Sequence, residues 1–152
     1  MNVNEEIKLS SLIAPSFYGV HKDIKENAHT HYFLKGGRGS TKSSFVSIEI
    51  ILGIMKNPYR NCVAIRKVGL YVHDSIYEQL SWAITKLDAW EVWEKRLSPL
   101  ELIYKPTGQK ILFRGADDPR KLKSTKVQNG YIGYVWYEEA DQFDGMEQIR
   151  SI

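Results

Sequence analysis

The chain has 152 residues, a hydrophobic fraction of 43% and a formal net charge of +3 at pH 7. This length suits one domain with one sizeable core, and four Trp with nine Tyr argue against a disordered chain. The single cysteine, Cys62, excludes an intrachain disulfide and therefore a disulfide-stapled secreted scaffold. The mild positive charge permits a polyanionic partner without requiring one.

No segment of the sequence predicts a membrane helix or a signal peptide. No run approaches the roughly 20 apolar residues that span a bilayer. The first residues include acidic side chains where a signal peptide is basic, and the four histidines lack the spacing of a zinc site. We therefore expect a soluble cytoplasmic protein with no membrane partner and no structural metal.

The first third of the chain predicts an arm, a strand and a helix. Residues 1–29 are polar and weakly patterned, and we interpret them as an N-terminal arm with a short aromatic turn. Residues 30–35 predict a short strand. A helix that is apolar on nearly every face follows over about 42–56 and ends before Pro58.

The rest of the chain alternates strands and helices. CVAIRK (62–67) predicts a buried parallel strand, and apolar residues at helical spacing predict a helix over about 74–87. LELIYKPTGQKILFRG (100–115) predicts a β-hairpin, DDPRKLKSTK (117–126) a charged loop, and YIGYVWYEEAD (131–141) a strand that ends in acids. This order predicts an α/β fold with right-handed crossovers.

A glycine-rich junction, GGRGSTKSS (36–44), joins the first predicted strand to the first predicted helix. Backbone N–H groups without β-carbons, followed by a helix N-terminus, form a site for phosphate groups. At this spacing Lys42 is expected to reach the β- and γ-phosphates of ATP and Ser43 to bind Mg²⁺. The stretch departs from the G-x-x-x-x-G-K-[ST] pattern only at Thr41, which replaces the last glycine.

We therefore expect ATP and Mg²⁺ to be bound by the residues of this junction. The alternative is a glycine turn with a surface lysine. The expected binding residues are Gly36, Gly37, Gly39, Ser40, Thr41, Lys42, Ser43 and Ser44.

Three further charged residues complete the expected catalytic site. Arg38, inside the glycine-rich loop, predicts an arginine finger acting on charge at the γ-phosphate, with a solvated loop cation as the alternative. Glu138 follows the last predicted strand and is assigned to the magnesium shell. Glu139 is assigned as the general base that orients water. The expected catalytic residues are therefore Arg38, Lys42 and Glu139. A solvated acidic pair is the alternative, and Asp141 is a weaker candidate for the metal.

With both motifs in hand, the chain resembles the N-terminal ATPase region of phage terminase large subunits, in particular the PBSX-like group. The matching stretches are GGRGSTKSS, AIRKVGLYVHDSIYEQLSWAI, LFRGADDPRKLKS and YVWYEEADQF. The resemblance implies an ASCE-type P-loop NTPase domain over residues 30–152, with a mostly parallel sheet, flanking helices and a β-hairpin insertion. It also implies an ATP-hydrolysing motor that translocates double-stranded viral DNA into procapsids in the host bacterial cytoplasm.

The resemblance further implies partners and missing parts. The partners are double-stranded DNA, the portal protein, the terminase small subunit and, at full length, further copies in a ring. Such ATPases insert a strand between the P-loop strand and the acid-bearing strand, and carry a C-terminal nuclease domain. Neither is visible here, so we expect a fragment whose sheet has a gap. Phe17 and Tyr18 are candidates either for adenine contact or for packing of the arm.

Two other functions remain open from the sequence. One is an ATP-binding fragment or assembly module without turnover, and the other is a small-molecule P-loop kinase, although no arginine-rich lid is visible. Several cations are candidates either for sequence-independent contacts with DNA phosphates or for solvated charges. They are Arg66, Lys67, Arg120, Lys121, Lys123 and Lys126.

Overall fold

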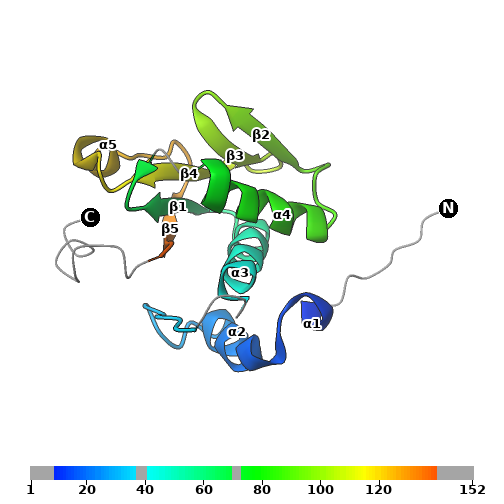
Figure 1. The fold of residues 1–152 in the computed structure, drawn as a ribbon. Helices are drawn as coiled ribbons and strands as arrows, with labels where there is room; N and C mark the ends of the chain where they lie inside the picture. The colour runs from blue at the N-terminus through cyan, green and yellow to red at the C-terminus, as the bar shows by residue number, and fades with distance from the viewer. Residues whose placement is uncertain (1–8, 37–40, 70–72, 140–152) are drawn as a thin grey trace.

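The computed structural model describes residues 9–36, 41–69 and 73–139. Its centre is a five-stranded sheet in the order β2-β3-β4-β1-β5 (Figure 1). The strands are β1 (Arg60–Arg66), β2 (Trp93–Leu97), β3 (Leu100–Tyr104), β4 (Gln109–Gly115) and β5 (Tyr131–Tyr137). Strand β1 pairs in parallel with both β4 and β5, whereas β3 pairs antiparallel with β2 and β4.

The expected α/β class and the β3–β4 hairpin are confirmed, but the sheet is mixed rather than mostly parallel. The hairpin extends to a third antiparallel strand, β2, which the sequence pattern did not predict. Its burial pattern explains the omission: Trp93 is buried and the four residues after it are exposed. A strand with one buried residue lacks the alternation from which half-buried strands are recognised.

Two helices cover one face of this sheet. Helix α3 (Lys42–Lys56) packs against α4 (Glu78–Lys86), which follows a π-helical turn, η3 (His73–Tyr77). Their apolar side chains form one core with alternate residues of β1, including Cys62 and Ala64. The predicted helix over 42–56 is confirmed at both ends, and the predicted helix over 74–87 is confirmed as η3 followed by α4.

A smaller apolar cluster lies on the opposite face of the sheet. Val63 and Ile65 of β1 pack there with Leu122 of a short helix, α5 (Pro119–Lys123). Strand β1 is therefore buried on both faces, as its continuous apolar run predicted. The expectation of a charged loop over 117–126 was wrong at α5, because Asp118 caps this helix by accepting from the Lys121 backbone N–H at 3.2 Å.

The described part of the N-terminal arm is largely helical. It contains α1 (Leu9–Leu12), a 3₁₀ turn η1 (Pro15–Phe17) and α2 (Tyr18–Lys25), and it packs against α3 through a third apolar cluster. The predicted strand over 30–35 was wrong for the described structure, because no strand pairs with this segment. The expected lack of the inserted strand, and the gap that it would leave in the sheet, stay predictions.

The described ranges contain no helix that is both long and apolar enough to cross a membrane.

Candidate active site

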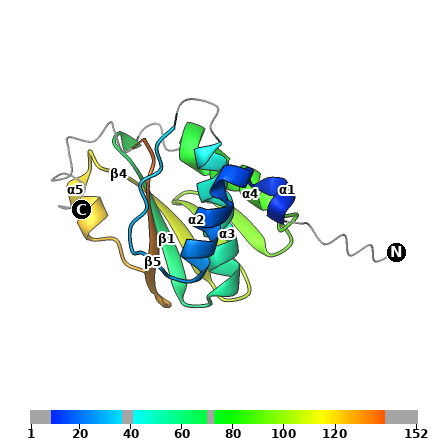
Figure 2. The same cartoon turned by 90° about the horizontal axis from the view of Figure 1, so that it is seen from below.

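The start of α3 and the ends of two parallel strands lie at one end of the molecule. Residues 57–59 join the end of α3 to β1, so β1 runs back along the helix toward Lys42. Because β5 pairs in parallel with β1, its carboxyl end lies there as well (Figure 2). The start of α3 at Lys42 and the two acids that follow β5 therefore lie at the same end of the sheet.

Lys42 is the first residue of α3, and its side chain reaches back to Gly36. Its Nζ donates a hydrogen bond to the carbonyl of Gly36. Ser43 and Ser44 follow in the first helical turn and are half-buried. Four expected site residues lie outside the described residues, namely Gly37, Arg38, Gly39 and Ser40.

Thr41 has a strained backbone at the position where the phosphate-binding pattern has glycine. Its φ is 61°, in the left-handed region, and it precedes α3 as the N-cap without a side-chain cap hydrogen bond. Glycine adopts this conformation without penalty, whereas a β-branched residue there is a genuine outlier. The threonine thus occupies the conformation that the glycine of the pattern would supply.

The strand register brings the two acids beside the end of β1. Ile65 pairs with Tyr137, and the backbone N–H of Glu138 donates to the Ile65 carbonyl at 3.0 Å. The Glu138 side chain is 12% exposed, whereas that of Glu139 is 44% exposed. Glu139 also has a positive φ of 53°, another strained position at the same end of the sheet.

Arg66, the last residue of β1, is the centre of the charge network around these acids. Its Nη2 donates to Glu139 Oε2 at 3.0 Å, and its Nε lies 4.0 Å from Glu138 Oε2. Its Nη1 donates to the Ser75 hydroxyl at 2.6 Å, which donates in turn to Glu138 Oε2 at 3.0 Å. In this structure the Arg66 guanidinium therefore binds the site's own acids.

Burial of Glu138 raises the pKa of its carboxyl, and desolvation is the largest cause. The hydrogen bond from Ser75 and the charge of Arg66 oppose this rise, whereas the neighbouring charge of Glu139 adds to it. The carboxylate is thus partly withdrawn from water and depends on Ser75 and Arg66 for its stabilisation. The sequence pattern gave no signal for Ser75, which lies 63 residues away along the chain.

The residues at this end of the sheet are the ones that could hold a nucleoside triphosphate and Mg²⁺. Within the described part of the chain no group of three or more His, Cys, Asp or Glu side chains could hold a metal alone. Mg²⁺ in proteins is bound by one or two carboxylates, with substrate phosphates and water completing its shell. Ser43 and Glu138 carry oxygen atoms of this kind, and Lys42 carries a cationic side chain.

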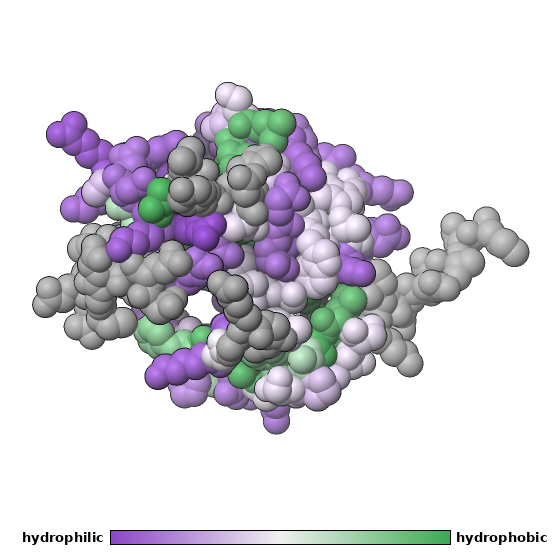
Figure 3. Space-filling model, viewed as in Figure 1, coloured by the Kyte–Doolittle hydropathy of each residue, from purple (hydrophilic) through white to green (hydrophobic). Residues whose placement is uncertain are grey.

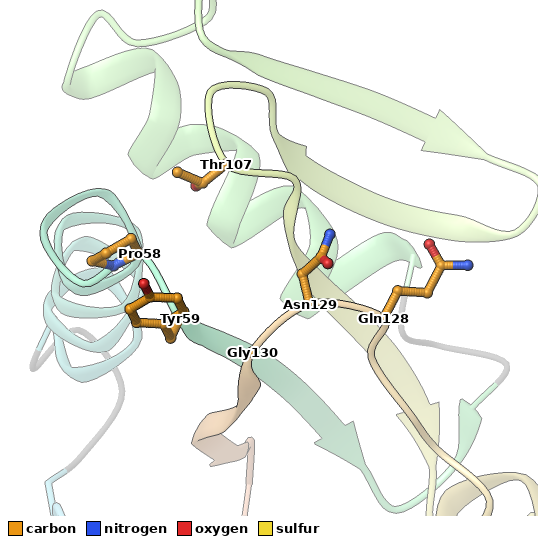
Figure 4. Close-up of a pocket in the computed structure, with 6 residues that line it drawn as sticks. All are labelled: Pro58, Tyr59, Thr107, Gln128, Asn129 and Gly130. Carbon is orange, nitrogen blue, oxygen red and sulfur yellow. The ribbon is translucent and has the colours of Figure 1, made fainter.

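A surface hollow of about 530 Å³ lies at the opposite end of the sheet. It is lined by Pro58, Tyr59, Thr107, Gln128, Asn129 and Gly130, at the amino ends of β1 and β5 (Figure 4). None of the expected site residues lines it. The hollow is therefore separate from the end of the sheet where Lys42 and Glu138 lie.

The cations expected to contact DNA divide into two groups, apart from Lys67, which follows β1 and is half-buried. Arg66 is 18% exposed and paired with the acids, so its role in this structure is within the site. The basic residues of α5 and the segment after it are exposed, and hydrophilic side chains cover this region (Figure 3). They are Arg120, Lys121, Lys123 and Lys126.

The fold and site together define an α/β domain that has a cation, hydroxyls and carboxylates at the end of the sheet where β1 and β5 finish. Comparison with known proteins identifies the family. Residues 28–152 match the phage terminase large subunit family. The chain therefore belongs to that family, as its motifs predicted.

Two relatives extend this match. The chain is 39% identical to the terminase large subunit of Bacillus phage SPP1 over 148 residues. The aligned region covers 97% of this chain and 35% of that protein. It is 34% identical to the PBSX phage terminase large subunit of Bacillus subtilis strain 168 over 122 residues. That aligned region covers 79% of this chain and 27% of the relative. The chain thus spans about a third or less of the length of these relatives.

Proposed function

We propose that this chain is the ATP-hydrolysing portion of a phage terminase large subunit, which drives double-stranded viral DNA into procapsids. One observation carries the proposal. The family match includes both the Lys42 segment and the Glu138–Glu139 segment, and connectivity brings these two segments to one end of the sheet. A P-loop enzyme needs its phosphate-binding lysine and its metal-associated acid at one site.

In this proposal the glycine-rich segment, Gly36 to Ser44, cradles the phosphates of ATP. Lys42 neutralises their charge, and Ser43 with Glu138 holds Mg²⁺. Mg²⁺ held by these two residues would supply positive charge that offsets the negative charge of the phosphates. Arg38 in the same segment stabilises charge that develops at the γ-phosphate.

Glu139 is the proposed general base. Its carboxylate is the more exposed of the two acids, so water reaches it more readily than Glu138. It orients a water molecule and accepts its proton on a carboxylate oxygen. Arg66 Nη2 donates to Glu139 Oε2 at 3.0 Å and so holds this carboxylate in position beside the end of β1.

The DNA and protein partners of this proposal come from the family. Exposed cations of α5 and the segment after it suit sequence-independent contact with DNA phosphates. The portal protein, the small subunit and further copies in a ring are the proposed protein partners. The proposed location is the cytoplasm of the bacterial host.

Binding of ATP tests the first half of the proposal. Calorimetric titration with Mg²⁺·ATP is expected to show binding that Lys42→Ala weakens by at least about tenfold, because a charged hydrogen bond to phosphate is lost. Lys56→Ala, at the other end of α3, removes the same charge and is expected to bind ATP normally. Equal ATP affinity of the two variants would show that Lys42 does not contact the bound ATP.

Turnover tests the second half. Glu139→Gln is expected to retain ATP binding and to lose about 10²- to 10⁴-fold in hydrolysis rate, the usual contribution of a general base. Glu94→Gln, at an exposed acid of β2, is the matched control. Binding without measurable turnover in the unaltered chain would instead favour a nucleotide-binding module.

A further inference from the structure

Ser75 occupies the centre of the hydrogen-bonded chain between Arg66 and Glu138. Its hydroxyl lies 2.6 Å from Arg66 Nη1 and 3.0 Å from Glu138 Oε2. A guanidinium has donors and no acceptor, so the Ser75 oxygen must accept from Arg66. Its single proton is then available to Glu138, and the direction of both hydrogen bonds is fixed by chemistry alone.

The backbone around Ser75 is unusual as well. Ser75 lies within the π-helical turn η3, immediately before α4. Turns of this type are rare and occur frequently at functional sites. Here Ile76 and Tyr77 of the turn are buried in the core beside α3. The turn is thus anchored in the core while Ser75 reaches the acid at the end of β5.

We propose that Ser75 is a positioning residue that orients the Glu138 carboxylate for the binding of Mg²⁺·ATP. The inference rests on the proposed function, and it assigns to η3 a part in the site that the motifs do not describe. Glu138 Oε2 is held from two sides, by the Ser75 hydroxyl and by the more distant Arg66 Nε at 4.0 Å. Loss of the hydroxyl leaves the side chain of Glu138 with more rotational freedom.

The test compares ATP affinity in Mg²⁺ with ATP affinity in EDTA. Ser75→Ala is expected to weaken binding in Mg²⁺ by roughly tenfold to a hundredfold, the worth of one hydrogen bond to a charged group, and to leave binding in EDTA unchanged. Ser75→Thr keeps the hydroxyl and is expected to retain the wild-type dependence on Mg²⁺. Ser81→Ala is the matched control, since Ser81 is buried on α4 and its Oγ has no partner in the described structure.

The outcomes separate this inference from the function on which it rests. If the unaltered chain binds ATP equally in Mg²⁺ and EDTA, the proposed metal site itself fails. If it responds to Mg²⁺ and Ser75→Ala responds equally, or loses affinity equally in EDTA, the positioning role is overturned. Should thermal melting show that Ser75→Ala is unfolded, Ser75→Cys, which keeps the side chain's shape with a weaker donor, decides in the same assay.

Discussion

The ring of Phe17 lies flat against the ring of Phe45, with centroids 4.6 Å apart and planes inclined by 6°. The pair joins the N-terminal arm to α3, the helix that begins with Lys42. Because Phe17 is 9% exposed and covered by Phe45, the structure favours packing of the arm over adenine contact for this residue. Tyr18 is 42% exposed, and its hydroxyl donates to the Ser10 carbonyl at 2.8 Å.

Removing the Phe17 ring is expected to weaken the packing of the N-terminal arm against α3. Phe17→Ala should lower the free energy of unfolding by about 3 kcal/mol, through lost burial and the cavity that remains. Phe33→Ala, at a side chain that is 62% exposed, should change it by less than about 0.5 kcal/mol. Urea unfolding measures both values. Equal effects of the two substitutions would mean that the arm does not pack on α3.

Thr41→Gly is expected to relieve backbone strain before α3. A left-handed φ costs a non-glycine residue about 1–2 kcal/mol, of which the greater freedom of glycine in the unfolded chain recovers a part. The variant should therefore gain up to about 1 kcal/mol in free energy of unfolding. Asn27→Gly is the control, since Asn27 has a similar φ of 53° but asparagine tolerates it. Destabilisation by Thr41→Gly would contradict the strained geometry.

Alanine substitutions at two glycines with similar φ distinguish the cost of backbone strain from the cost of steric overlap. Gly130 has φ +77°, and an added Cβ would lie 2.0 Å from the Tyr59 carbonyl oxygen. Gly108 has φ +73°, but its nearest neighbour would be 3.7 Å away. Gly108→Ala should cost about 1 kcal/mol of stability, whereas Gly130→Ala should cost at least about 3 kcal/mol. Thermal unfolding compares them, and a similar loss for both would contradict the close approach at Gly130.

Glu49 on α3 is expected to give the fold a distinctive pH dependence. Burial raises the pKa of its carboxyl above the ordinary value of 4.5, although contact with His21 of α2 and the charge of Lys56 oppose the rise. Between pH 4.5 and the raised pKa the folded chain binds more protons than the unfolded chain, so this residue's contribution to stability falls as pH rises.

The measurement is urea unfolding over this pH range. Glu49→Gln should reduce the decline that the wild-type chain shows just above pH 4.5, and the decline that remains includes the contribution of Glu138, whose pKa is also raised. Glu94→Gln, at an exposed side chain on β2, should keep the decline. An unchanged pH profile in Glu49→Gln would show that another group is responsible.

The elements that could be predicted are those whose signals are local. Helix α3 was predicted from Lys42 to Lys56 because a glycine-rich segment precedes it and Pro58 follows it. Strand β1 was predicted from one unbroken apolar run. By contrast, β2 is exposed along most of its length, and its place in the sheet depends on pairing with β3, which no local pattern encodes.

The motifs of the candidate site could be predicted from the sequence, but the side-chain contacts within the site could not. Lys42 and Glu138 were proposed from spacing, and their placement at one end of the sheet follows from the short connection between α3 and β1 and from the parallel pairing of β1 with β5. The contacts of Arg66 with Ser75 and both acids depend on the register of β1 against β5 and on the η3 turn. These are tertiary relationships, so the sequence suggested DNA contact for Arg66, whereas the structure pairs it with the acids.

The central claim is that the helix carrying Lys42 and the strand carrying Glu138 act on the same nucleotide. A crystal structure of the chain with Mg²⁺ and a non-hydrolysable ATP analogue tests this most directly. We expect the phosphates at the start of α3 in contact with Lys42, and the metal between Ser43 and the Glu138 carboxylate. Phosphates bound elsewhere, or a metal that lies beyond the reach of Glu138 even through a water molecule, would contradict it.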